Sequence, residues 1–93
     1  MSTTPLLTAF DKAIAEVASA ERAKMVRTAA GEPADERLAS LRRELELARE
    51  RAADTGAVDP EWLRVTIRST MEWIPETRLR IVAALGGIAR AAG

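Results

Sequence analysis

The chain has 93 residues, with 14 Lys or Arg against 14 Asp or Glu, and it contains no Cys, His or Tyr. Without Cys and His it lacks a thiolate nucleophile, a disulfide, an imidazole base and the usual ligands of zinc and copper sites. Its formal charge of zero gives no general attraction to a nucleic-acid backbone or an anionic membrane. We therefore expect a single domain over residues 1–93, with no metal, no cofactor and no nucleic-acid partner.

The sequence predicts an all-helical protein without a membrane partner. Residues that favour helices, Ala above all, are frequent, whereas the aromatic and β-branched residues that favour strands are sparse. The first residues do not combine a basic start with an apolar stretch, and no uncharged run is long enough to span a bilayer. We expect a cytoplasmic protein.

The first helix is predicted over residues 5–30. Thr4 supplies an N-cap hydroxyl, Pro5 suits the first helical position, and Gly31 follows the end of the helix. A stripe with three- and four-residue spacing, typical of a buried helix face, consists of Leu7, Phe10, Ile14 and Val17. The continuation of this stripe reaches Glu21, which we attribute to a small rotation of the buried face.

The second helix is predicted over residues 34–55. Asp35 and Glu36 place negative charge in its first turn, where a helix N-terminus is positive. Its apolar seam alternates in the manner of a helical hairpin and consists of Leu38, Leu41, Leu45, Ala48 and Ala52. We expect it to pack antiparallel to the first helix, with Leu47 off the seam.

The third helix is predicted over residues 60–74. Gly56 ends the preceding helix, and Asp59-Pro60-Glu61 combines an N-cap, a first-turn proline and a first-turn acid. Val58 and Leu63 can pack against each other across this start. Its apolar arc spans half the circumference and consists of Trp62, Leu63, Thr66, Ile67, Thr70, Met71, Trp73 and Ile74.

The last segment, residues 75–92, either continues the third helix through a kink at Pro75 or forms a fourth helix. We expect the kinked continuous helix, because no Gly or Asn accompanies the proline to help the chain turn. One apolar face consists of Ile81, Val82, Leu85, Ile88, Ala89 and Ala92. Gly86 and Gly87 are small enough to admit another backbone. The fold class is therefore a small antiparallel bundle of three long helices, the third kinked or broken at Pro75.

The wide apolar arc of residues 60–74 predicts self-association. It exceeds what one neighbouring helix requires, and a chain of this size buries only a limited share of its surface. We expect a non-catalytic interaction or assembly module that binds a second copy of itself, a dimer first, or another protein. The expected interface consists of Trp62, Ile67, Met71, Trp73, Ile81, Leu85 and Ile88. The alternative is that both Trp side chains fill the core of a monomer.

A small enzyme, or a binder of a dicarboxylate metabolite, is the alternative function. Glu61, Glu72 and Glu76 are candidate acid–base residues, but helix-end electrostatics and a pair with Arg68 explain them more simply. The reaction class that needs neither His nor Cys is the rearrangement of a dianion held by arginines. The candidates for this anion site are Arg22, Arg27 and Arg78.

The stretch 56–68, with its Asp59-Pro60-Glu61 helix start, resembles the start of the last helix in the all-helical chorismate mutase family. The resemblance implies a three-helix fold that rearranges a small dianion. Where that family places an Arg in its first helix, this chain offers Glu21 or Arg22 depending on register, and Arg78 falls where a Gln is usual. The catalytic positions of the family therefore do not carry over cleanly.

Overall fold

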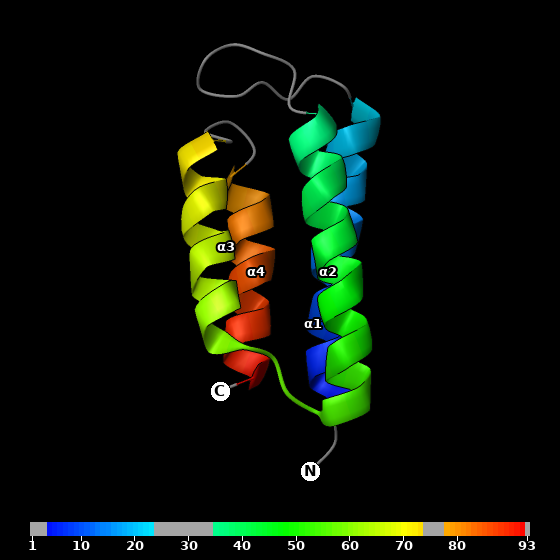
Figure 1. Ribbon diagram of the computed structural model, residues 1–93. Coiled ribbons are helices and arrows are strands. Elements are labelled where there is room, and N and C mark those ends of the chain that lie inside the picture. Colours follow the sequence, from blue (N-terminus) through cyan, green and yellow to red (C-terminus); the bar gives the residue numbers. More distant parts are fainter. Residues whose placement is uncertain (1–3, 24–34, 74–77, 93) are drawn as a thin grey trace.

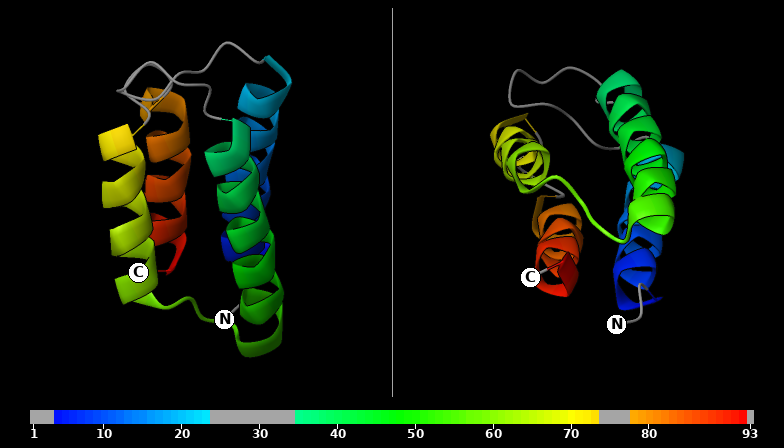
Figure 2. Two further views of the ribbon diagram at one scale, coloured as in Figure 1. Left: turned by 45° about the horizontal axis from the view of Figure 1, so that its top comes forward. Right: turned by 60° about the horizontal axis from the view of Figure 1, so that its bottom comes forward.

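The computed structural model describes residues 4–23, 35–73 and 78–92, which form four α-helices (Figure 1). They are α1 (Thr4–Ala23), α2 (Asp35–Thr55), α3 (Pro60–Trp73) and α4 (Arg78–Ala92). Successive helices run in opposite directions (Figures 1 and 2). The predicted all-α antiparallel bundle is confirmed.

The helices contact one another in the order α2, α1, α4, α3. Helix α1 packs against both α2 and α4, whereas α3 packs against α4 alone. Between the described parts of α2 and α3 there is no close backbone approach. Figure 2 shows the four helices as a two-by-two bundle, with α2 and α3 along one side and α1 and α4 along the other. The bundle is therefore closed by backbone contacts on three sides and open between α2 and α3.

One apolar core joins the four helices. Its fully buried side chains include Phe10 and Val17 from α1, Leu45 from α2 and Leu85 from α4. Burying one such side chain stabilises the folded state by about 1.5–3 kcal/mol. On α1 the most buried face consists of Leu6, Phe10, Ala13 and Val17. The predicted stripe is therefore rotated slightly, because α1 must cover two neighbours, and Leu7 and Ile14 are half-buried at its edge.

The connection between α2 and α3 has the predicted caps. Gly56 has a φ of 74°, and its N–H donates to the carbonyl oxygen of Ala52 at 2.8 Å. The Oδ1 atom of Asp59 accepts a hydrogen bond of 2.9 Å from the N–H of Glu61, which satisfies an otherwise unpaired donor of the first turn. Val58 is half-buried against the core that contains Leu63. These contacts place α3 antiparallel to α2.

The expected kinked continuous helix is wrong. Helices α3 and α4 run in opposite directions and pack against each other, so the chain reverses between Trp73 and Arg78 (Figure 1). The position of Pro75 itself lies outside the described residues. The reversal has a clear physical reason, because it buries the apolar face of α4 inside the bundle. A helix that continued outward would have left that face in water.

Gly86 and Gly87 do not serve the predicted close approach of another backbone. A Cβ atom added to either glycine would come within 4 Å of the Arg90 side chain and of no other helix in the described part of the chain. Ala83, on the same side of α4, is exposed. Gly86 and Gly87 therefore do not mark a close helix contact in the described residues, whereas Ala84 is the small residue of α4 that lies in the core.

Candidate functional site

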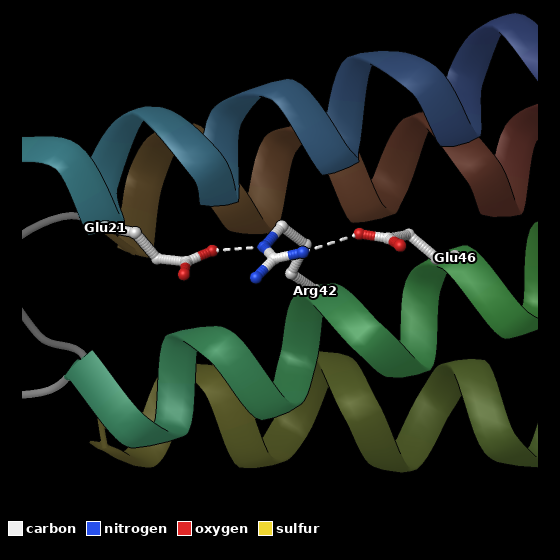
Figure 3. Close-up of polar contacts among 3 residues, drawn as sticks. All are labelled: Glu21, Arg42 and Glu46. Carbon is white, nitrogen blue, oxygen red and sulfur yellow. Dashed lines mark hydrogen bonds and ion pairs between the residues drawn. The ribbon is translucent and has the colours of Figure 1, made fainter.

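On the side of α2 that faces α1, the charged side chains form ion pairs within the protomer. Arg42 donates from Nε to Glu21 at 2.6 Å and from Nη1 to Glu46 at 2.8 Å (Figure 3). Arg49 of α2 donates from Nε to Asp11 of α1 at 2.6 Å. The hydrogen bond to Glu21, supported by the one to Glu46, raises the pKa of the Arg42 guanidinium. Glu21 therefore lies beside the core stripe because it pairs with α2, a contact that the sequence did not indicate.

The opposite side of α2 borders an open groove, which we call the α2–α3 groove. It consists of two adjoining hollows of about 320 and 310 Å³, which share Glu44 of α2 and Trp62 of α3. The first hollow extends toward Arg51, and the second extends toward Ser69. The groove exists because α2 and α3 lie along the same side of the bundle without packing closely against each other.

The rim of the α2–α3 groove carries exposed apolar side chains. Leu47 on α2 is 51% exposed and Val65 on α3 is 55% exposed, although both are large and apolar. Trp62 is half-buried between them and packs against the core. Exposed apolar side chains gathered along one groove are typical of surfaces that bind another protein.

The polar groups on the floor of the groove are satisfied within α3. The buried hydroxyl of Thr70 donates to the carbonyl oxygen of Thr66 at 2.8 Å. The hydroxyl of Thr66 donates to the carbonyl oxygen of Trp62 at 2.7 Å. These two donors therefore need no acceptor from a ligand.

Glu44 and Arg51 are the groove's charged residues that matter most for recognition. Both are exposed, and neither forms an ion pair within the described part of the protomer. They differ in this from Arg42 and Arg49, which are paired on the α1 side. Arg37 and Asp59 also line the groove and are exposed, but Asp59 caps α3 and Arg37 has an interaction of its own. Glu44 and Arg51 are therefore the acid and the base left for a partner, with Leu47 between them.

The expected interface residues on α3 do not form one surface. Trp62 lies in the α2–α3 groove. Ile67 is half-buried on the side that faces α4, and Met71 is 48% exposed. Trp62 and Met71 are nine residues apart, which places them on opposite sides of a helix with 3.6 residues per turn. Trp73 ends α3, but its side chain lies outside the described residues.

The expected interface residues on α4 lie inside the protomer. Ile81 is 1% exposed, and Leu85 and Ile88 are fully buried in the core shared with α1. They have no surface left for a second copy, so including them in the interface needs correction. The reason is the chain reversal, which turns the apolar face of α4 inward.

A third hollow, of about 460 Å³, lies between α3 and α4 near the C-terminal end of α4. Its walls are mainly apolar and include Val58, Ile67 and Ala89. Arg64 stands at its edge, where both Glu61 carboxylate oxygens accept hydrogen bonds of 2.8 Å from its Nη2 atom. The one cation at this hollow is therefore already paired.

Of the three arginines of the alternative anion site, the structure describes the side chain of Arg22. Arg22 is exposed on the last turn of α1. Arg27 lies outside the described residues. Arg78 begins α4, but its side chain lies outside the description. The anion site therefore stays a prediction.

Residues 4–23, 35–73 and 78–92 also bear on metal binding and membrane insertion. No group of three acidic side chains there comes together to hold a metal ion. In the same ranges, no helix has the length and apolar character needed to cross a bilayer.

Sequence reasoning missed Leu47, Val65, Glu44 and Arg51 as site residues. One signal was available for Leu47, because it is a large apolar residue off the helix seam. The others gave none, because an exposed Val, Glu or Arg is ordinary on a helix surface. Their importance comes from the separation of α2 and α3.

The resemblance of residues 56–68 to the chorismate mutase family rests on a helix start. The structure contains this start, in the form of the Gly56 and Asp59 caps. Such caps are common to many helices, so they carry no catalytic position. Comparison of the chain with protein-family models, curated proteins and solved structures gives no match.

Proposed function

We propose that this protein is a non-catalytic interaction or assembly module that acts in the cytoplasm as a homo-oligomer, with a dimer as the smallest assembly. The α2–α3 groove is the surface that binds. The observation that carries the proposal is the pair of exposed apolar side chains, Leu47 and Val65, on the two rims of that groove. Covering them with a partner removes apolar surface from water.

The size and core of the bundle support the same function. Trp62 packs against the core and also borders both hollows of the groove. Trp side chains in this half-buried position are enriched among the residues that dominate binding energy. A small bundle also gains more from covering an open groove than a large protein does, because it buries a smaller fraction of its surface alone.

Sedimentation equilibrium over about 1 μM to about 1 mM tests the proposal. The wild type is expected to self-associate within this range. The double variant Leu47→Lys/Val65→Lys is expected to stay monomeric, because each lysine places a charge in the contact.

Met71→Lys is the matched control. It introduces the same charge at an equally exposed apolar residue of α3, on the side away from the groove. Self-association of Met71→Lys should match the wild type. A monomeric wild type, or equal effects of the control and the groove variants, would contradict the proposed function.

A further inference from the structure

The two charged residues of the α2–α3 groove that lack partners in the described protomer complement each other in a second copy of this chain. Glu44 and Arg51 are seven residues apart on α2, so they share one face and lie about 10 Å apart along the helix axis. Leu47 and Ala48 lie midway between them and line the same groove. The sequence of groups along this face is acid, large apolar, small apolar, base.

We propose that α2 pairs with α2 of a second copy in antiparallel orientation, around a twofold axis that passes between Leu47 and Ala48. In this register Glu44 lies opposite Arg51 of the second copy, and Arg51 lies opposite the second copy's Glu44. The twofold axis repeats each contact, so a single unpaired acid and base yield two ion pairs. This inference rests on the proposed function and names the partner and the register of the same groove.

Three other arrangements of two α2 helices lack this complementarity. A parallel pair sets Glu44 against Glu44 and Arg51 against Arg51 of the second copy, and like charges at such positions destabilise the contact. In an antiparallel pair centred on Glu44 or on Arg51, that residue lies opposite the same residue of the second copy, so like charges meet. Centring the axis between Leu47 and Ala48 brings both acids opposite both bases.

The apolar centre of the proposed pair is also complementary. Leu47 of each copy lies opposite Ala48 of the other, so a large side chain meets a small one at both places. This alternation lets two helices approach to the usual 8–10 Å between axes. Trp62 and Val65 of α3 border the groove and add apolar contact for the incoming helix.

The arrangement of charges on α2 favours a second copy of the chain over an unrelated helix as the partner. Arg42 and Arg49 already pair with acids on α1, and the exposed Arg43 and Glu50 do not line the groove, so Glu44 and Arg51 are the charges that α2 offers within the groove. On the groove side, the acid and the base of one α2 helix face the base and the acid of a second, antiparallel α2 helix. A foreign helix would need only complementary charges of its own, whereas self-complementarity is what a twofold interface requires.

Charge exchange tests the register by sedimentation equilibrium. Glu44→Arg and Arg51→Glu are each expected to weaken dimerisation about tenfold or more, because both ion pairs become like-charge pairs. An equimolar mixture of the two variants should form a heterodimer with the affinity of the wild type, because opposite charges face each other again. The double variant Glu44→Arg/Arg51→Glu should also dimerise like the wild type.

Arg43→Glu and Glu50→Arg are the matched controls. They make the same charge changes seven residues apart on α2, at exposed positions that do not line the groove. Neither control should change the dimerisation constant. Melting followed by circular dichroism verifies that every variant is folded, and recovery in the mixture gives the same information independently.

The outcomes separate the register from the proposed function. A wild type that self-associates while Glu44→Arg and Arg51→Glu have no effect overturns the register and leaves the groove proposal standing. Failure of the mixture and of the double variant to recover dimerisation also overturns the register. A wild type that stays monomeric contradicts both.

Discussion

Gly56 and Asp59 fix the α2–α3 connection at the level of single residues. Gly56 takes a left-handed conformation with a φ of 74°, which side chains other than Gly and Asn rarely adopt. Asp59 accepts the N–H of Glu61 and so caps α3. Both roles could be predicted from the sequence, because each depends only on neighbouring residues.

Gly56→Ala is expected to lower the free energy of unfolding by about 1 kcal/mol, because the added Cβ is strained at positive φ. Urea denaturation of the two proteins measures the difference. Gly56→Asn is the control, since Asn tolerates this conformation better and should cost less. Equal losses for the two variants would show that the strain argument does not hold.

At the scale of one element, the helix faces divide into those the sequence could predict and those it could not. The seam of α2 was predictable, because α2 packs on one neighbour and Leu38, Leu41 and Leu45 are all buried. The face of α1 was shifted, because α1 contacts two helices. Periodicity reports the average direction of the apolar side chains and does not say how many neighbours share them.

Gly86 and Gly87 offer the clearest prediction for an element. Both lie inside α4, and an added Cβ at either would meet only the end of the Arg90 side chain, at 3.6 or 3.8 Å. Gly86→Ala and Gly87→Ala should each raise the free energy of unfolding by about 1 kcal/mol, because Ala favours the helix. Thermal denaturation measures the change.

Ala83→Gly, also on the exposed side of α4, serves as the reverse control and should lower stability by a similar amount. A loss of stability in Gly86→Ala or Gly87→Ala would mean that these glycines serve a contact rather than only exposing backbone.

At the scale of the whole molecule, the choice of neighbouring helices determines where the candidate groove lies. Composition and local signals predicted the all-α class and the antiparallel α1–α2 hairpin. They did not reveal the chain reversal after α3 or the gap between α2 and α3, because both follow from tertiary packing of α4 on α1. The candidate groove was therefore out of reach, although Trp62 pointed to one of its walls.

The assembly makes a prediction for the stability of the entire protein. If dimerisation couples to folding, the melting temperature of the wild type should rise with protein concentration, by mass action. The melting temperature of Glu44→Arg should change little over the same range. Circular dichroism melts at about 5 μM and about 500 μM compare the two proteins. A wild-type melting temperature independent of concentration would contradict the coupling.

The contact between α1 and α4 also affects how the protein forms on the ribosome. Because α1 needs α4 to cover one of its apolar faces, that face stays open until residues 78–92 have been synthesised. The N-terminal hairpin can close early, since its contacts are local, but the nascent bundle gains its second layer only when residues 78–92 emerge. Helix α4 therefore completes the interior, and a product truncated before it would expose Phe10 and its neighbours to chaperones and proteases.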